Sequence, residues 1–188
     1  MSFEVKSTTI PGCLEILPSI LRDDRGLFVK TFHQELFTEH GLKTGFAEEY
    51  YSVSSQGVLR GLHFQLPPRE HVKMVYCVDG EVIDAVVDLR VGSPTFGKYE
   101  IFSLSGEKAN MLHIPAGLAH GFYVTSRHAT MMYKVTTVYS PEHDAGILWN
   151  SVGIPWPDAN PLISRRDGEF APFAAFKSPF LFQKEHAK

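Results

Sequence analysis

The stretch VKMVYCVDGEVIDAVVDLR, residues 72–90, decides the fold class of this chain. It holds two runs rich in β-branched and aromatic residues, 72–78 and 81–89, with Asp79-Gly80 between them. Because Asp and Gly tolerate the positive φ angles of a type I′ turn, this spacing predicts a two-residue β-hairpin. The stretch therefore indicates an antiparallel sheet.

Apolar and charged side chains fall on opposite faces of the run at residues 81–90. Strict alternation puts the apolar residues 83, 85, 87 and 89 on one face, while the other face carries Asp84, Asp88 and Arg90. In an open sheet the charged face contacts solvent. In a small barrel the same face lines a polar cavity that carries the chemistry. The alternation alone leaves both interpretations open.

Other short β-rich runs, broken by turn residues, surround this stretch. They cover residues 50–54, 58–64, 99–104, 109–114, 121–124 and 130–139. Their spacing is typical of an all-β sandwich or barrel. One short helix is predicted at 32–42, where Thr31 and Gln34 have capping-box spacing and Gly41 ends the last turn. The chain is therefore predicted to be all-β with a few short helices.

Length and composition set the class of protein. The chain has 188 residues, which we interpret as one domain over residues 1–188, and its 44% hydrophobic and 21% charged residues are typical of soluble globular proteins. A net charge of -3 gives no general attraction to nucleic acid or anionic lipid. The first residues lack a secretory signal pattern and no apolar run suits a membrane span, so we expect a cytoplasmic protein. Cys13 and Cys77 lack disulfide or zinc spacing and are predicted to be buried apolar residues.

The sequence signatures of several enzyme classes are absent. Glycine-rich nucleotide-binding motifs, the HExxH zinc motif and the GxSxG hydrolase motif do not occur. The chain instead has nine histidines, of which His63, His71, His113 and His120 lie at or near predicted strands. A single histidine near a strand is more often structural than catalytic. The histidines therefore need a second signal before they indicate a site.

Residues 115–120, PAGLAH, match the PxGxxH pattern in the second motif of cupins, which are small double-stranded β-helix barrels. Metal-binding cupins pair this pattern with HxH and a following Glu, whose side chains converge on one ion. Here Phe64 and Gln65 follow His63, so that ligand set is broken. We predict no metal, and a metal-dependent cupin oxygenase or isomerase is the second interpretation.

A larger set of motifs resembles one family in order and spacing. The motifs are GVLRGLHFQLPP (57–68), GEVIDAVVDLR (80–90), SPTFG (93–97), HIPAGLAHGF (113–122), MMYKVTTVYSP (131–141) and GILWN (146–150). Over roughly residues 4–167 the chain resembles the dTDP-4-dehydrorhamnose 3,5-epimerases. The resemblance implies a cupin jelly-roll barrel and an epimerase without metal or nucleotide cofactor. It also implies that the substrate is a nucleotide-diphosphate 4-keto-6-deoxyhexose.

The chemistry of such a reaction explains the residues that these motifs contain. C3 and C5 flank the C4 ketone, so loss of either proton gives an enolate, and return of a proton to the other face inverts the carbon. The reaction needs a base near neutral pKa, an acid across the ring and positive donors around O4. By the resemblance, His63 is the base, Asp167 orients it, Tyr133 is the acid and Lys73 stabilises the oxyanion. Taken alone, Tyr133 would be an aromatic residue of the barrel wall.

The resemblance also implies which residues bind the substrate. Guanidinium groups suit phosphate oxygens through paired donors, and Arg25 and Arg60 match positions that hold the diphosphate, although any one arginine is usually solvated. Arg166 stands where the family usually has Lys before the Asp. His120 and Asp84 match positions inside the pocket. The full predicted set is Arg25, Phe28, Lys30, Glu48, Arg60, Asp84, His120, Tyr139 and Arg166.

Further expectations concern local structure and assembly. Arg60 and His63 have opposite parity on one strand, so both face a cavity only if a bulge or twist occurs at Gly61. The family fold implies a homodimer in which an N-terminal strand, carrying Arg25 and Phe28, crosses to complete the partner's pocket. The aromatic segment 170–188 is interpreted as a packed C-terminal tail.

The chain departs from the family pattern where the resemblance places the nucleotide base. Lys30 stands at a Glu position, Glu48 at a Gln position and Tyr50 at an Asn position. A carboxylate only accepts hydrogen bonds and an ammonium only donates them. This exchange suits cytosine, which offers an amino donor, better than thymine. We therefore hypothesise a CDP-linked rather than a dTDP-linked sugar; alternatively, Lys30 and Glu48 simply pair with each other.

Two questions remain open at the level of sequence. One base and one acid serve both carbons, so the residues do not distinguish double from single epimerisation. A non-catalytic cupin that binds a sugar nucleotide is a third interpretation. The complete set of His63, Asp167 and Tyr133 argues against it, because binding alone does not require that trio.

Overall fold

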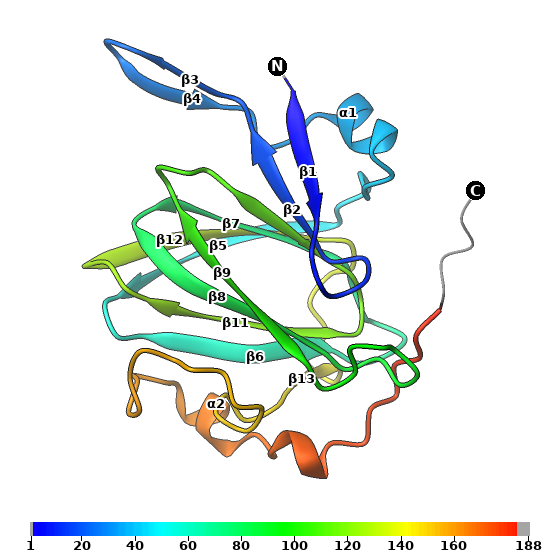
Figure 1. Ribbon diagram of the computed structural model, residues 1–188. Helices are drawn as coiled ribbons and strands as arrows, with labels where there is room; N and C mark the ends of the chain where they lie inside the picture. The colour runs from blue at the N-terminus through cyan, green and yellow to red at the C-terminus, as the bar shows by residue number, and fades with distance from the viewer. Residues whose placement is uncertain (1, 184–188) are drawn as a thin grey trace.

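Two antiparallel sheets packed face to face form the body of the protein in the computed structural model, which describes residues 2–183 (Figure 1). The first sheet has the spatial order β1 (Phe3–Ser7), β2 (Leu14–Pro18), β10 (Met111–Ile114), β7 (Lys73–Asp79), β12 (His128–Val135), β5 (Glu48–Ser55). The second has the order β13 (Asp144–Gly146), β6 (Leu59–Gln65), β11 (Leu118–Val124), β8 (Glu81–Asp88), β9 (Tyr99–Ser105). The remaining elements are the β3 (Ile20–Asp23) and β4 (Gly26–Val29) hairpin, α1 (Gln34–Glu39), α2 (Arg165–Glu169) and the 3-10 turn η1 (Phe173–Ala175). This confirms the prediction of an all-β barrel with short helices.

The Asp79-Gly80 turn does not form the predicted hairpin. β7 pairs with β10 and β12 in the first sheet, whereas β8 pairs with β9 and β11 in the second. Gly80 has the expected positive φ of 83°, but the turn carries the chain from one sheet to the other. A Cβ on Gly80 would overlap the carbonyl oxygen of His128, so the site also needs glycine for space. The hairpin prediction was wrong because the same two-residue turn can join two paired strands or two strands of different sheets. Strands distant in sequence decide which of the two occurs.

The alternation along residues 81–90 is explained by burial on both faces of β8. Asp84 is fully buried between the sheets, on the same face as Val82 and Val86 of the central core. On the opposite face, Ala85 and Val87 belong to a second apolar cluster. Asp84 therefore faces the interior of the barrel, and the solvent-face interpretation was wrong.

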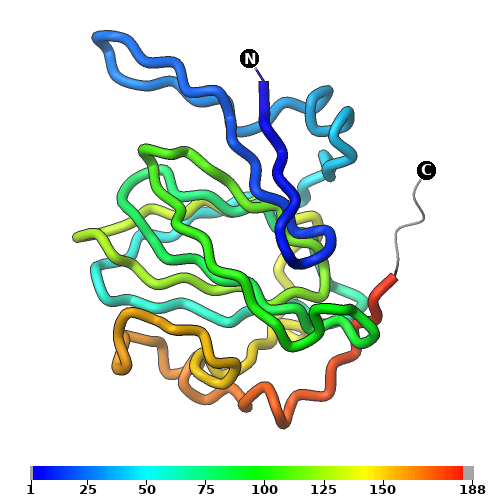
Figure 2. Tube along the Cα trace, viewed as in Figure 1, coloured from blue at the N-terminus to red at the C-terminus, as the bar shows by residue number. Residues whose placement is uncertain are grey.

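The C-terminal segment covers the outer face of the second sheet. Figure 2 shows it, from orange to red, passing outside β6 and β13. Phe173, Phe176 and Phe180 pack on the cluster that includes Leu62 and Phe64 of β6. The last five residues of the predicted tail, 184–188, lie outside the described residues. This covering segment also brings α2 against β6.

The first helix is shorter than the sequence predicted. α1 begins after His33 rather than Thr31, and no side-chain hydrogen bond caps it, so the capping-box prediction was wrong. Gly41 has a φ of +70° just beyond the helix, as expected for the residue that ends it. Phe37 is fully buried against the outer face of the first sheet. Burial of this one ring, rather than capping, holds the short helix in place.

An irregularity at Gly61 brings Arg60 and His63 to the same side of β6. His120 of β11 pairs with His63, and Phe122 pairs with Arg60, so the register shifts between these pairs. Gly61 has a φ of +142°, and a Cβ there would lie 2.6 Å from the Cα of Gly121. The predicted bulge or twist at Gly61 is confirmed.

Several strand boundaries differ from the prediction. β10 begins at Met111 because Ala109 has a φ of +49° in the preceding turn, and β12 ends at Val135 rather than 139. β11 begins three residues earlier than predicted, at Leu118. The sequence analysis assigned no ranges to β1–β4 or to β13. The hairpin of β3 and β4 projects away from the barrel of its own chain (Figure 1).

The cysteines and the helices bear on two expectations from composition. Cys13 and Cys77 are buried free thiols, as predicted. Within residues 2–183, none of the helices has the length and apolar character needed to cross a bilayer. The cytoplasmic location stays a prediction.

Candidate active site

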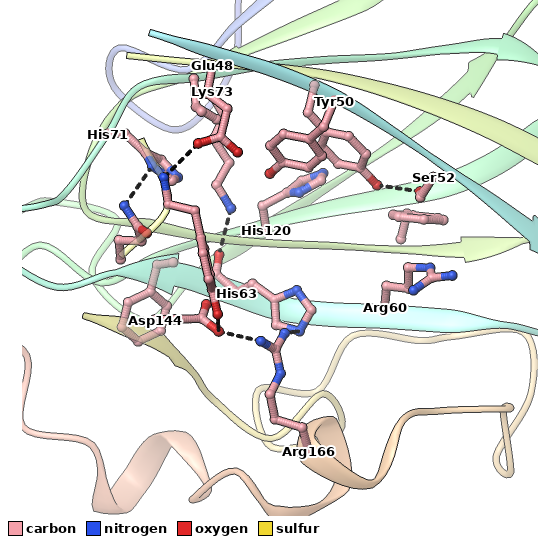
Figure 3. A pocket seen from close by; sticks show the side chains of 16 residues that line it. Glu48, Tyr50, Ser52, Arg60, His63, His71, Lys73, His120, Asp144 and Arg166 are labelled. Atoms are coloured by element: carbon pink, nitrogen blue, oxygen red, sulfur yellow. Dashed lines mark hydrogen bonds and ion pairs between the residues drawn. The ribbon is translucent and has the colours of Figure 1, made fainter. Parts of the chain in front are cut away.

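One cavity of about 310 Å³ opens at the end of the barrel where β5, β6 and β12 meet the loop before β13 (Figure 3). Its wall is polar on the side of β6 and aromatic on the side of β5 and β12. The lining residues are Glu48, Tyr50, Ser52, Arg60, His63, Phe64, Gln65, His71, Lys73, His120, Phe122, Tyr133, Val135, Tyr139, Asp144 and Arg166. Both sheets therefore contribute to the cavity.

His63, which lines the cavity, is hydrogen-bonded to the buried carboxylate of Asp167. His63 Nε2 lies 2.9 Å from Asp167 Oδ1, and the backbone N–H of Gly61 donates to Asp167 Oδ2 over 3.1 Å. Ser164 caps α2 by accepting from the backbone N–H of Asp167, which fixes the carboxylate against β6. Although burial would raise the pKa of Asp167, the hydrogen bonds from His63 and Gly61 lower it to about 2. The carboxylate is therefore ionised at neutral pH.

The tautomer of His63 follows from its two neighbours. Burial lowers the pKa of His63 below its ordinary range, and this effect exceeds the opposing effect of Asp167, so the ring is neutral near pH 7. Arg166 Nη2 also lies 3.0 Å from Nε2, but a guanidinium only donates and Asp167 only accepts, so Nε2 can satisfy just one of them. Asp167 is 3% exposed and charged, whereas Arg166 is 49% exposed and has Asp144 as a partner. We assign the proton to Nε2, which leaves the lone pair on Nδ1.

Lys73 places a buried ammonium group beside the imidazole. Its Nζ donates to the backbone carbonyl of His63 over 3.3 Å, and Figure 3 shows the side chain pointing toward His63 across the cavity. Burial lowers the pKa of Lys73 to about 8. The group therefore carries a positive charge at neutral pH and can stabilise a nearby oxyanion.

Tyr133 lies on the other sheet from His63. Its hydroxyl is 3.1 Å from Ser52 Oγ, and its ring stacks on Tyr50 with centroids 4.7 Å apart and planes 14° apart. Burial raises the pKa of Tyr133 well above its ordinary value. The phenol is therefore protonated at neutral pH and is a proton donor.

A second histidine–aspartate pair joins His120, which lines the cavity, to the buried Asp84. His120 Nε2 is 2.7 Å from Asp84 Oδ2, and both side chains are almost fully buried. Burial raises the pKa of Asp84 above its ordinary value, and Asp84 Oδ1 has no hydrogen-bond partner among the described residues. Because His120 and His63 are register partners on adjacent strands, their two rings face the same cavity.

The rim of the cavity carries charged and aromatic groups. Arg166 donates to Asp144 Oδ2, and the hydroxyl of Tyr139 is 3.4 Å from the same oxygen. The backbone N–H of Tyr139 donates to Glu48 Oε2 over 2.7 Å. Arg60 donates from Nε to Ser54 Oγ, which leaves its other nitrogens for a ligand. The rim thus presents two guanidinium groups and one half-exposed aromatic ring.

The structure does not bring every predicted residue to this cavity. Arg25 and Phe28 lie on the β3–β4 hairpin and Lys30 directly follows it, and none of them lines the cavity of its own chain. Among the described residues no ion pair joins Lys30 to Glu48 within one chain, and Glu48 instead accepts from the backbone N–H of Tyr139. The other predicted site residues line the cavity or contact a residue that does.

Sequence reasoning missed several residues of the cavity. Ser52 and Asp144 received no functional prediction, and neither did Gln65, which holds the backbone of Ser140 and the ring of His71. Alternation along residues 48–54 would have placed Ser52 on the same face as Glu48 and Tyr50. Asp144 had no such signal, because its strand β13 has only three residues.

The residues described here do not form a metal site. Within residues 2–183, no group of three or more His, Cys, Asp or Glu side chains is arranged to hold a metal ion. Each cavity histidine pairs instead with a carboxylate or an amide.

The fold and the site define a cupin-type carbohydrate epimerase. Residues 7–175 match the family described as dTDP-4-dehydrorhamnose 3,5-epimerase. The chain is 46% identical to the protein of that name from Shigella flexneri over 166 residues, which cover 87% of this chain and 92% of the relative. It therefore belongs to the dTDP-4-dehydrorhamnose 3,5-epimerase family, and it is an isomerase, as the resemblance implied.

Solved structures agree with this assignment. The epimerase RmlC from Legionella pneumophila Philadelphia 1, in complex with dTDP-4-keto-L-rhamnose, has a TM-score of 0.91 and 35% identity, with 96% of this chain and 99% of that chain covered. ChmJ from Streptomyces bikiniensis, a 3'-monoepimerase in complex with dTDP-quinovose, has a TM-score of 0.85 and 34% identity, with 90% and 87% covered. The chain thus resembles both a 3,5-epimerase and a monoepimerase.

Proposed function

We propose that this chain inverts C3, C5 or both in a nucleotide-diphosphate 4-keto-6-deoxyhexose by proton transfer through an enolate. The observation that carries this proposal is the placement of base and acid on opposite sheets. His63 belongs to β6 of the second sheet and Tyr133 to β12 of the first, and both line one cavity. A planar enolate between them would meet a proton acceptor on one face and a proton donor on the other.

The proposed steps balance in protons and electrons. His63 Nδ1 takes the proton from the carbon beside the ketone, and the electron pair of the C–H bond moves to O4, where Lys73 donates a hydrogen bond. Asp167 stabilises the imidazolium that forms. Tyr133 then gives its hydroxyl proton to the opposite face of the carbon, and the ketone forms again. Exchange with solvent returns a proton to Tyr133 and removes one from His63.

The substrate class is supported by the rim of the cavity and by the ligands of the relatives. Arg60 and Arg166 offer the paired donors that a diphosphate accepts. Tyr139, 56% exposed, presents a ring face on which a nucleobase can stack. The RmlC and ChmJ structures contain dTDP sugars. The carboxylate of Glu48 adds a hydrogen-bond acceptor at this rim, and the amino group of cytosine could donate to it. A cytidine nucleotide therefore stays our prediction.

The test is incubation in D₂O with dTDP- and CDP-linked 4-keto-6-deoxyglucose, followed by mass and NMR analysis. Two incorporated deuterium atoms indicate action at both carbons, and one indicates a single-centre enzyme. His63→Asn should lower the rate by about 10²- to 10⁴-fold, while the matched control His128→Asn, at an exposed histidine, should not. Absence of deuterium with either nucleotide would refute the catalytic proposal, and turnover of the dTDP sugar alone would refute the cytidine hypothesis.

We also propose that the β3–β4 hairpin completes the cavity of a second copy, which makes the active form a homodimer. Leu21, Leu27 and Phe28 are each about half exposed on this hairpin, and such apolar surface favours contact with a partner. The Arg25 side chain is 89% exposed, and its Nε and Nη2 donate to Asp23 of the same hairpin, which leaves Nη1 for a diphosphate. Lys30 lies at the base of the same hairpin.

Mixing two inactive variants tests the exchange. In an exchanged dimer, a heterodimer of Arg25→Ala and His63→Asn chains has one cavity with an intact base and an intact partner hairpin. Random pairing should therefore restore about a quarter of wild-type activity after the chains are unfolded and refolded together. A failure to restore activity, with dimers present on gel filtration, would show that the hairpin does not act on the partner's cavity.

A further inference from the structure

Two side chains of β5, Tyr50 and Ser52, contact the phenol of Tyr133 and have no part in the proton transfers proposed above. Tyr50 is the direct register partner of Tyr133 across β5 and β12, and its ring stacks on the phenol. Ser52, two residues further along the same face of β5, lies 3.1 Å from the Tyr133 hydroxyl. One strand therefore holds both the ring face and the oxygen of this tyrosine (Figure 3).

These contacts restrict motions that would carry the Tyr133 hydroxyl away from the substrate carbon. A phenol rotates about its Cα–Cβ bond and carries its oxygen over several ångström, whereas proton transfer requires the oxygen within about 3–3.5 Å of the carbon. The stacked ring of Tyr50 blocks movement on one side, and the hydrogen bond to Ser52 fixes the oxygen. Tyr50 is 40% exposed, whereas Tyr133, on which its ring stacks, is 7% exposed.

Ser52 has a second effect, on the charge that Tyr133 carries after it gives up its proton. Burial disfavours this phenolate and raises the pKa of Tyr133, whereas the hydrogen bond from Ser52 lowers the pKa. A serine hydroxyl can either accept from the phenol or donate to the phenolate. It can therefore follow the tyrosine through both protonation states without a change of position.

We propose that Tyr50 and Ser52 are positioning residues that aim the Tyr133 hydroxyl at the enolate and thereby favour inversion over simple return of the proton. This inference rests on the proposed function. Removal of either contact leaves His63, Asp167 and Lys73 in place, so the enolate still forms. Without an aimed donor, His63 returns a solvent-derived proton to the face from which it took one, and the carbon keeps its configuration.

The measurable quantity is the ratio of exchange with retention to inversion at C3 or C5 in D₂O. Retained, deuterated substrate and inverted product are distinguished by NMR coupling constants and by mass. Loss of a hydrogen bond to a developing charge should raise this ratio about tenfold or more in Ser52→Ala. Tyr50→Leu, which removes the flat ring, should raise it in the same direction. General damage to the fold lowers both rates together and leaves the ratio unchanged.

Conservative and control variants make the test specific. Ser52→Thr keeps the hydroxyl and Tyr50→Phe keeps the ring, so both should have a ratio near that of the wild type. Ser55→Ala and Tyr51→Leu alter the outward-facing side of the same strand, where both residues are exposed, and should leave the ratio unchanged.

Each remaining outcome counts against a stated claim. An active wild type with an unchanged ratio in Ser52→Ala and Tyr50→Leu would refute the positioning inference alone. A Tyr50→Phe ratio as high as that of Tyr50→Leu would refute the stacking contribution. A wild-type chain that neither exchanges nor inverts would refute the proposed function and this inference with it.

Discussion

Replacement of Asp167 by Asn tests whether this carboxylate holds His63 in the tautomer that a base requires. Both carboxylate oxygens accept from N–H groups: Oδ1 from His63 Nε2 over 2.9 Å and Oδ2 from the Gly61 backbone over 3.1 Å. An amide of the same shape has one acceptor and one donor. If its oxygen stays with Gly61, its NH₂ group faces Nε2 and drives the ring proton to Nδ1. The lone pair then points away from the substrate.

Two magnitudes follow from this geometry. Loss of a correctly oriented base costs about 10²- to 10⁴-fold in kcat/KM, because that is the usual contribution of a positioned proton-transfer group. The opposite amide orientation leaves the Gly61 N–H facing a donor, and a buried unsatisfied donor costs about 1–3 kcal/mol of stability. The variant should therefore fold with reduced stability and be nearly inactive.

The assay compares kcat/KM for epimerisation with the denaturant-induced unfolding of the same samples. Glu169→Gln is the matched control, since this carboxylate lies on the same helix and pairs with Arg165 at the surface. Its effects should be small on both measurements. A folded Asp167→Asn protein with kcat/KM within about threefold of the wild type would refute the assignment of the tautomer.

Three further predictions concern pH and the backbone. The epimerisation rate should rise with pH as His63 loses its proton, at a pH below the ordinary histidine pKa, and should fall as Lys73, with its pKa of about 8, loses its charge. Lys73→Arg should move the fall in rate to higher pH. A fall at the same pH in this variant would contradict the role of Lys73. Burial lowers the pKa of His71 to about 3, so as pH falls the unfolded chain protonates His71 before the folded protein does. The free energy of unfolding should therefore decrease as pH falls from about 6.5 to 3. His71→Gln should flatten this pH dependence in urea titrations at several pH values. Gly61→Ala should cost about 1–3 kcal/mol or more in the same titrations, because its Cβ would lie 2.6 Å from Gly121 at a φ of +142°, whereas Gly45→Ala, with open space around it, should not.

The sequence predicted the β content and much of the site, but not how the strands pair. The turn at Asp79-Gly80 was recognised correctly as a turn with positive φ, yet it connects two sheets, because pairing depends on partners as distant along the chain as Val135 is from Lys73. The parity conflict between Arg60 and His63 did predict the irregularity at Gly61, since both side chains had to face one side. The alternation of side chains predicts which residues share a face of a strand, but it does not predict which strands pair with it.

Some site residues could likewise be predicted from sequence, and others depend on how the strands assemble. His63, Lys73, His120 and Tyr133 lie within recognisable motifs on long strands, and the structure brings them to one cavity. Ser52 and Asp144 come from an edge strand and a three-residue strand, whose functional positions only the assembled barrel reveals. The β3–β4 hairpin projects from its own barrel, as the resemblance implied for a strand that carries Arg25 and Phe28, so Lys30 at its base lies away from the cavity that Glu48 lines in the same chain.

The contact between His63 and Asp167 spans 104 residues of chain, and the last strand of the barrel ends at Gly146. A ribosome therefore completes every strand described here before it adds the carboxylate that orients the imidazole. The same later segment carries Phe173, Phe176 and Phe180, which cover Leu62 and Phe64 of β6. A protease that cut the chain before Ser164 would therefore remove the carboxylate that contacts the imidazole and an apolar cover of the barrel in one step, so loss of the proposed base and loss of stability would coincide.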